Sequence, residues 1–294
     1  MIVNPRSGKT KSRAPLFDAV SRFGRSGWLV RVAETDRRGH AAELAAQLGG
    51  GYDAVVCVGG DGTLNETITG LMTLSPRPPL GYLPFGSTND FAASLHIPAS
   101  LPEAAELVAD GTPRALDIGC HNGRYFAYVA SFGAFTRASY MTPQSIKNAL
   151  GHTAYILEGI QELSQIRDVH VRLELDDDQV IEGDFLFGAI CNSTSVGGIL
   201  TLDPKQVDMR DGKFEILLVR SPKDLAEIHE CVLAVQRQKY NCKMMTFCSA
   251  RKIKIYADPQ MPWTLDGEKE EGHSEIEIEN LHHAFKLMKK EDRI

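Results

Sequence analysis

The stretch from Asp53 to Met72 constrains the fold of this chain more than any other part of its sequence. It begins with a short run of apolar, mostly β-branched residues, which is typical of a buried parallel strand. Gly59-Gly-Asp-Gly62 follows directly, and apolar residues then recur at helical spacing as far as Met72. A strand, a glycine-rich turn and a helix in this order predict one repeat of an α/β domain.

The start of the predicted helix is expected to bind an anion. Thr63 and Glu66 have the spacing of a capping box, with Thr63 as the N-cap residue. Backbone N–H groups at a helix start, together with the positive end of the helix dipole, favour a phosphate group. Asp61 would repel a bare phosphate, which suggests a metal ion or a hydroxyl group nearby. The stretch has neither the Walker pattern nor the Rossmann pattern.

Two further polar loops follow predicted strands. The first runs from Asn4 to Lys9 and carries the cations Arg6 and Lys9, and the second runs from Pro84 to Ala92. Because the carboxyl ends of parallel strands share one edge of a sheet, we expect all three loops to lie close together. The predicted strands cover residues 1–3, 28–32, 53–58 and 80–83, and the predicted helices cover residues 13–23, 41–48 and 101–110.

The pattern changes near Arg114 to short apolar runs separated by turn residues. We predict strands at residues 115–118, 123–132, 168–175, 184–191, 212–220, 253–257, 276–278 and 283–288, and helices at residues 146–167 and 222–238. The predicted fold is α/β, with an N-terminal doubly wound α/β nucleotide-binding domain and a C-terminal, mainly antiparallel β-sandwich domain. The first covers residues 1–114 and the second residues 115–294, with the last residues able to return to the first domain. The active site is expected in the cleft between them.

Composition excludes some classes of protein. A net charge of −6 argues against a dedicated nucleic-acid binder. The six cysteines are far apart, which favours free thiols in a reducing compartment. The sequence shows no signal peptide, and no apolar run approaches the roughly 18–20 residues that span a bilayer. We therefore expect a cytoplasmic protein without a transmembrane segment.

Five motifs in the order and spacing found here resemble those of one family. They are Asn4 to Gly8, Gly59 to Glu66, Leu83 to Ala92, Asp208 to Lys213 and Asp266 to Glu268. Together they look like the diacylglycerol kinase catalytic-domain family of soluble lipid kinases, which includes bacterial diacylglycerol kinases and sphingosine kinases. The resemblance covers nearly the whole chain. It implies the two-domain architecture predicted above and phosphorylation of a lipid hydroxyl that depends on ATP and Mg²⁺.

The resemblance implies a set of residues that bind ATP. In the third loop, Ser87 stands where the family usually has threonine, and Thr88 follows it, so a hydroxyl group is retained. Which of the two hydroxyls contacts the nucleotide is left open. The implied ATP-binding residues are Asn4, Pro5, Arg6, Ser7, Gly8, Thr35, Gly59, Gly60, Asp61, Gly62, Thr63, Leu64, Asn65, Glu66, Ser87 and Thr88.

The resemblance also implies a metal site and a general base. Asp208, Asp211 and the carbonyl group of Lys213 match a Mg²⁺ site away from the nucleotide, and such oxygen ligands suit a hard cation. Glu268 matches the proposed base that accepts the proton of the lipid hydroxyl. Asp61 is the rival, either as the base or as a ligand of Mg²⁺–ATP. Without the resemblance, the Asp-Gly pairs at both motifs predict turns only.

The expected function is therefore transfer of the γ-phosphate of ATP to a lipid, with diacylglycerol as the first candidate and phosphatidic acid as the product. The alternatives are an enzyme like NAD kinase and a catalytically inactive nucleotide-binding regulator. The lipid is expected at the membrane surface, through peripheral contact, and an exposed edge strand in the second domain would allow a homodimer. Candidates to line a slot for the acyl chains are Phe126, Phe132, Phe135, Tyr140, Tyr155 and Ile156.

Overall fold

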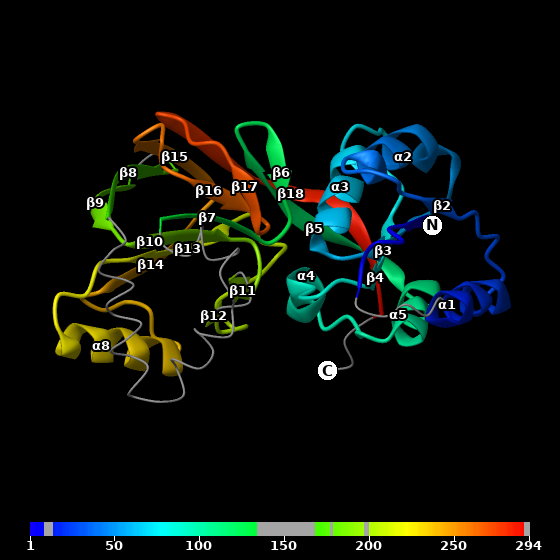
Figure 1. Ribbon diagram of the computed structural model, residues 1–294, viewed down its shortest axis with the longest axis horizontal. Helices are drawn as coiled ribbons and strands as arrows, with labels where there is room; N and C mark the ends of the chain where they lie inside the picture. The colour runs from blue at the N-terminus through cyan, green and yellow to red at the C-terminus, as the bar shows by residue number, and fades with distance from the viewer. Residues whose placement is uncertain (9–13, 134–167, 177–178, 197–199, 291–294) are drawn as a thin grey trace. The chain divides into compact units, whose positions relative to one another are not determined.

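The computed structural model describes residues 1–8, 14–133, 168–176, 179–196 and 200–290 (Figure 1). The chain divides into two compact units. Unit 1 contains Met1–Ile118 and His282–Ile294, and unit 2 contains Gly119–Leu281. Two strands, β5 (Thr112–His121) and β18 (Glu275–Lys289), contribute residues to both units.

Unit 1 is built on a parallel sheet. Its strands lie in the order β2 (Ala33–Glu34), β1 (Ile2–Val3), β3 (Val55–Gly59) and β4 (Leu80–Pro84), and β18 pairs in parallel with β4. Every residue of β3 and β4 is buried, and the two strands pair in register from Val55 opposite Leu80 to Gly59 opposite Pro84. The continuous apolar runs in these strands follow from burial on both faces. The predicted parallel sheet is confirmed.

Two pairs of helices cover this sheet, with α2 and α3 on one side and α1 and α5 on the other (Figure 1). Because helices cover both faces of the sheet, the predicted doubly wound arrangement is confirmed. Helices α2 and α3 pack closely at Gly70, where an added Cβ atom would lie 2.2 Å from the carbonyl oxygen of Ala42. The helices are α1 (Ala14–Arg25), α2 (His40–Leu48), α3 (Asp61–Leu71), α4 (Asp90–Ser94) and α5 (Leu101–Ala109), with a 3₁₀ turn at Gly49–Gly51.

Unit 2 contains two antiparallel sheets. One has the order β14-β13-β10-β7-β16-β17, and the other joins β18, β15, β8 and β9, with β5 paired to β18 and β6 paired to β5. A short pair, β11 and β12, and helix α8 complete the described part. The bounds are β6 (Arg124–Phe126), β7 (Val129–Gly133), β8 (Val169–Leu175), β9 (Gln179–Phe185), β10 (Phe187–Cys191), β11 (Ser195–Val196), β12 (Leu200–Thr201), β13 (Phe214–Val219), α8 (Leu225–Gln236), β14 (Met245–Ala250), β15 (Lys252–Ala257), β16 (Trp263–Leu265) and β17 (Glu268–Glu270).

The core of unit 2 lies between these sheets, so the predicted β-sandwich is confirmed. Alternate residues such as Val171, Leu173 and Leu175 of β8 point inward from one sheet. Phe126 and Phe132, predicted to line an acyl-chain slot, are fully buried in this core, where Phe126 stacks on Phe214. That prediction is wrong for these two residues. The other four candidates and the helix predicted at 146–167 lie outside the described residues.

Several predicted strand bounds differ from the structure. Residues 28–32 form no strand, because Leu29 is 98% exposed and pairing with β1 begins only at Ala33. The strand predicted at 184–191 is two strands, since β9 pairs in one sheet and β10 in the other. Similarly, residues 123–132 form β6 and β7, whereas the two strands predicted beyond residue 275 are one strand, β18. Strands β11, β12, β14, β16 and β17 were not predicted.

Within the residues that the structure describes, no helix has both the length and the apolarity to cross a membrane.

Candidate functional site

Four neighbouring strands of unit 1 end beside residues that the sequence singled out (Figure 1). Thr35 follows β2, Asn4 follows β1, Gly60 follows β3, and Phe85 follows β4. Backbone hydrogen bonds link successive strand ends: Thr35 N donates to Val3 O at 2.9 Å, and Phe85 N donates to Gly59 O at 2.7 Å. The predicted loops therefore share one edge of the sheet, the usual position of ligand sites in such folds.

Asn4 connects the first loop to the start of α3. Its side-chain amide donates a hydrogen bond to Thr63 Oγ1 at 2.9 Å, and its backbone N–H bonds to Val58 O at 2.9 Å. The predicted capping box is wrong, because α3 begins at Asp61 and its N-cap residue is Gly60. The glycines after β3 let the chain enter the helix three residues earlier than expected, so Thr63 lies inside the first turn.

Glycine residues allow the three loops to touch through their backbones. A Cβ atom at Gly86 would lie 2.5 Å from the Cα of Gly60, a distance that real Cβ atoms essentially never show. Gly8 has a left-handed conformation, with φ of 83°, and packs against Phe85. Only residues without a side chain permit this approach. The N–H groups in the first turn of α3 therefore lie close to the other two loops.

Asp61 links the glycine-rich loop to the third loop. Its carboxylate oxygens accept hydrogen bonds from the backbone N–H groups of Asp90, at 3.1 Å, and Phe91, at 3.3 Å. Asn89 precedes them in a left-handed conformation, and its side chain bonds to both N and O of Gly86. These contacts fix the Asp61 carboxylate at the start of α4, where the helix dipole favours negative charge.

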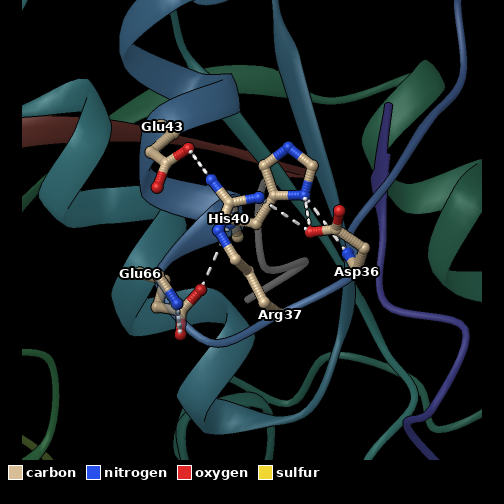
Figure 2. Close-up of polar contacts among 7 residues, drawn as sticks. Asp36, Arg37, His40, Glu43 and Glu66 are labelled. Atoms are coloured by element: carbon tan, nitrogen blue, oxygen red, sulfur yellow. Dashed lines mark hydrogen bonds and ion pairs between the residues drawn. The ribbon is translucent and has the colours of Figure 1, made fainter.

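Glu66 reaches from α3 to the start of α2 (Figure 2). Its two carboxylate oxygens accept hydrogen bonds from Gly39 N at 2.7 Å and from Ala41 N at 3.2 Å. The N-cap residue of α2 is Gly39, which has no side chain to cap the helix. Glu66 supplies the missing acceptor, so the structure gives it a role in anchoring α2, close in sequence to Thr35.

The remaining predicted ATP contacts differ in accessibility. Pro5, Arg6, Gly8, Ser87 and Thr88 are exposed. Ser7, Gly62 and Asn65 are half-buried, whereas Gly59 and Leu64 are buried. The Leu64 side chain is fully buried in the core, so only its backbone is available to a ligand. Lys9 lies outside the described residues.

In unit 2, Glu268 begins the second strand of a tight hairpin. Asp266 and Gly267 form its two-residue turn with positive φ angles of 51° and 79°, and Leu265 pairs with Glu268. This geometry matches the strong preference of Asp-Gly for such turns. Arg124 forms ion pairs with Glu268, at 3.3 Å, and with Glu270. The Glu268 side chain is 40% exposed, so this carboxylate is accessible.

Asp266 anchors this hairpin, a role that sequence reasoning missed. The residue is buried, and its carboxylate accepts backbone hydrogen bonds from Ala127 at 2.6 Å, Tyr128 at 2.9 Å and Val129 at 3.1 Å. Three donors around one carboxylate fix the turn against the start of β7. The position of Glu268, two residues later, therefore depends on Asp266.

The predicted metal ligands lie together in the loop before β13. Asp208 and Asp211 are exposed, and each accepts a hydrogen bond from a backbone N–H group two residues later. The carbonyl oxygen of Lys213 accepts a hydrogen bond from the Asn280 side chain at 2.9 Å. Asn280 also bonds to Asn192 at 3.3 Å, and Asn192 bonds to the carbonyl oxygen of Ala127 at 3.1 Å. Polar contacts thus extend from the predicted metal site toward the segment that holds Asp266.

A buried third carboxyl group lies beside this loop. Burial raises the pKa of Glu215 to about 8, and the nearby charges of Asp211 and Asp208 act in the same direction. Glu215 Oε2 and Asn280 Oδ1 are buried and have no hydrogen-bond partner among the residues the structure describes. Buried acceptors beside two carboxylates and a carbonyl group fit a hard cation such as Mg²⁺.

Comparisons with known proteins match both halves of the chain. Residues 1–121 match the diacylglycerol kinase catalytic domain, and residues 129–288 match the YegS C-terminal NAD kinase beta sandwich-like domain. The chain is 33% identical to a diacylglycerol kinase from Bacillus subtilis over 91% of this chain and 88% of that protein. It is 34% identical to one from Staphylococcus epidermidis over 91% of this chain and 84% of that protein.

Solved structures agree with the fold. A diacylglycerol kinase from Bacillus anthracis, 22% identical, superimposes with a TM-score of 0.76 over 99% of this chain and 96% of that chain. An NAD kinase from Archaeoglobus fulgidus, 14% identical, has a TM-score of 0.52 over 99% of this chain and 93% of that chain, which shows a related fold alone. By its sequence matches over nearly its whole length, the chain belongs to the diacylglycerol kinase catalytic-domain family.

Proposed function

We propose that this protein transfers the γ-phosphoryl group of ATP to the hydroxyl group of a lipid, with diacylglycerol as the acceptor and phosphatidic acid as the product. The relatives that match nearly the whole chain are named diacylglycerol kinases, which supports this acceptor. The observation that carries the proposal is the meeting of three polar loops at the start of α3, where Gly60 lies against Gly86 and Asn4 bonds to Thr63.

The nucleotide is bound in this proposal by groups at the edge of the parallel sheet. The backbone N–H groups in the first turn of α3 and the positive end of its dipole would hold the phosphates. The exposed Arg6 would add a positive charge, and the exposed hydroxyls of Ser87 and Thr88 would donate hydrogen bonds. Phosphoryl transfer depends mainly on such positioning and on neutralisation of charge, with little covalent chemistry for the protein to perform.

Glu268 accepts the proton of the lipid hydroxyl in this proposal. Its carboxylate is accessible and its backbone is fixed by the Asp266 turn, as a general base requires. Asp61, whose oxygens accept two backbone hydrogen bonds, would instead hold the glycine-rich loop in shape. One Mg²⁺ would be held by Asp208, Asp211 and the carbonyl group of Lys213, away from the nucleotide. A separate Mg²⁺ bound with ATP would neutralise phosphate charge. In this proposal, the enzyme is cytoplasmic and takes its lipid substrate from a membrane surface.

The test is transfer of label from γ-labelled ATP to diacylglycerol in detergent micelles. Wild type, Glu268→Gln and the neighbouring, exposed Glu271→Gln would be compared, with NAD as an alternative acceptor. We expect labelled phosphatidic acid from wild type and Glu271→Gln, and a rate about 10²–10⁴-fold lower from Glu268→Gln. Label on NAD alone would favour the NAD kinase alternative. ATP binding without transfer to either acceptor would favour the inactive regulator.

Equal rates of lipid phosphorylation by wild type and Glu268→Gln would support the lipid kinase activity but would show that Glu268 is not the general base. In that case Asp61→Asn would be the next variant. Light scattering of the same preparation would test whether the protein forms the homodimer that an exposed edge strand would allow.

A further inference from the structure

Three side chains that commonly bind metal ions meet on two strands of unit 1. Asp117 lies on β5, and His282 and His283 lie on β18, the strand that pairs with β5. One ligand atom from each residue lies within 4.8 Å of the other two. None of these residues belongs to the phosphate-binding loops or to the predicted Mg²⁺ ligands.

The backbone of β18 departs from a regular strand at this position. Side chains of successive strand residues normally point to opposite faces of a sheet. Here the imidazole rings of His282 and His283 instead stack with a centroid separation of 3.7 Å and an angle of 26°. His283 has a φ of 52°, in the left-handed region that residues other than glycine seldom adopt, although asparagine, aspartate and histidine occur there more often than the rest. The unusual backbone therefore brings two imidazoles to the same place.

Asp117 stabilises this conformation. Its Oδ1 atom accepts a hydrogen bond from His283 N at 2.7 Å and lies 3.1 Å from His282 Nδ1. The Asp117 side chain is fully buried, whereas the His282 side chain is 44% exposed. A buried carboxylate thus fixes one side of the cluster. The imidazole rings form its other side, which is exposed, so an ion could reach the cluster from solvent.

We propose that Asp117, His282 and His283 form a binding site for a divalent transition-metal ion of the Zn²⁺, Co²⁺ or Ni²⁺ type. Two imidazole nitrogens and one carboxylate oxygen are the donor set that these ions favour, whereas Mg²⁺ prefers oxygen ligands alone. Ring nitrogens bind through lone pairs in the plane of the ring, so the two exposed rings would turn from stacking to face the ion. Water would complete the coordination.

An ion bound here would fasten β5 to β18. Unit 1 consists of two chain segments, Met1–Ile118 and His282–Ile294. Asp117 is the next-to-last residue of the first segment, and His282 is the first residue of the second. The ion would therefore cross-link the two strands where the chain leaves unit 1 and where it returns. Binding to the folded state alone would raise the stability of the protein by mass action.

The test is titration of the full-length protein, without a histidine tag, with Co²⁺ and with Zn²⁺. Excess Mg²⁺ would be present, and Asp208→Ala/Asp211→Ala would serve as the background, so that binding at those carboxylates does not contribute. Visible absorption of bound Co²⁺, calorimetry with Zn²⁺ and the shift in Tm would be measured. We expect one equivalent bound, with nitrogen ligands visible in the Co²⁺ spectrum, and a rise in Tm.

Variants separate this site from adventitious binding. His283→Asn removes the imidazole and keeps a residue that tolerates the left-handed conformation, and His282→Gln keeps a side-chain polar group. Each should weaken binding by about 10-fold or more and abolish the rise in Tm. His229→Ala, at an exposed histidine of α8, should bind as the background does. No binding by the background would overturn the proposal, as would binding by His282→Gln and His283→Asn as tight as that of the background.

Discussion

The glycine-rich loops of unit 1 and the Glu268 hairpin of unit 2 are held by contacts of different range. The Gly60 loop directly follows a buried strand, and the other loops meet it because each follows a neighbouring parallel strand. The Glu268 hairpin is instead held through Asp266, whose carboxylate binds the N–H group of Ala127, 139 positions earlier in the chain. A single substitution in the hairpin can therefore remove contacts between segments that no local motif connects.

The difference also concerns the kind of atom that forms the contacts. In unit 1, the side chains of Asn4 and Asp61 also link the loops, but they can do so only because backbone approaches backbone closely at Gly60 and Gly86. In unit 2, buried polar side chains do so, and buried polar groups are costly when a partner is lost. We therefore expect substitutions of unit 2 to act first on stability, and substitutions of the unit 1 loops to act first on nucleotide binding.

Asp266→Ala should have the largest effect on stability. It removes a buried carboxylate and leaves three backbone N–H groups, of Ala127, Tyr128 and Val129, without this acceptor. We expect the free energy of unfolding to fall by about 4 kcal/mol, since each hydrogen bond to a charged group contributes about 1.5–3 kcal/mol and the losses are not additive. Denaturant unfolding followed by circular dichroism measures this change.

The matched control is Asp184→Asn, whose side chain is exposed on β9 and contacts the exposed His170. It should change the free energy of unfolding by less than about 0.5 kcal/mol. Equal effects of the two substitutions would show that Asp266 does not anchor the hairpin.

Gly86→Ala should weaken ATP binding by about 100-fold while the fold is retained, because its Cβ would lie 2.5 Å from the Cα of Gly60 and separate the two loops. Calorimetric titration with a non-hydrolysable ATP analogue measures the affinity. The control is Gly24→Ala in α1, where a Cβ atom meets nothing within 4 Å. If Gly86→Ala bound the analogue as tightly as Gly24→Ala, close packing of the loops would not be required.

The same contrast explains how much could be predicted from the sequence. The β3 strand, the glycine-rich turn and helix α3 depend on adjacent residues, and their pattern predicted them. Thr63 and Glu66 also have a local pattern, yet the structure uses Glu66 to cap α2, because the N-cap residue of that helix is Gly39. A short motif cannot show that a distant helix end will compete for the same side chain.

Unit 2 contains contacts that no pattern in the sequence indicated. Asn280 and Asn192 lie between the Lys213 carbonyl group and the segment at Ala127, and each stands in a run without a recognisable motif. The Asp-Gly pair at 266–267 predicted a turn, which is confirmed, but it could not predict the partners of the aspartate. Those partners are set by the packing of strands that are far apart in the chain.

His121 should make the stability of the protein depend on pH. It is buried against Trp263, and burial lowers its pKa to about 4. The unfolded chain then binds a proton more readily than the folded protein, so stability is lost as pH falls from about 6.5 toward 4. Between pH 7 and pH 5 this residue should lower the free energy of unfolding by about 2 kcal/mol.

His121→Gln, which does not titrate, should show a correspondingly smaller fall over the same range, whereas His229→Gln, at an exposed histidine, should behave as wild type. Unfolding curves recorded at several pH values measure the slopes. Identical slopes for His121→Gln and wild type would mean that His121 is protonated as readily in the folded protein as in the unfolded chain.

Glu66→Gln should have the smallest effect on stability. It tests whether a polar side-chain contact in unit 1 contributes both to stability and to nucleotide binding. The substitution retains one oxygen acceptor for the N–H groups of Gly39 and Ala41 but removes the second oxygen and the negative charge at the start of α2. We expect a loss of about 1 kcal/mol in the free energy of unfolding. Because Thr35 precedes this helix, we also expect a few-fold loss in ATP affinity.

Glu43→Gln provides the comparison within the same helix (Figure 2). Its carboxylate pairs with the exposed Arg37, and exposed ion pairs contribute little to stability, so both measurements should remain at their wild-type values. If Glu66→Gln lost stability without losing ATP affinity, the anchor of α2 would be a structural contact only. If it lost ATP affinity without losing stability, Glu66 would contact the nucleotide directly, as the resemblance implied. Loss of both is the result expected of an anchor that also positions the Thr35 loop.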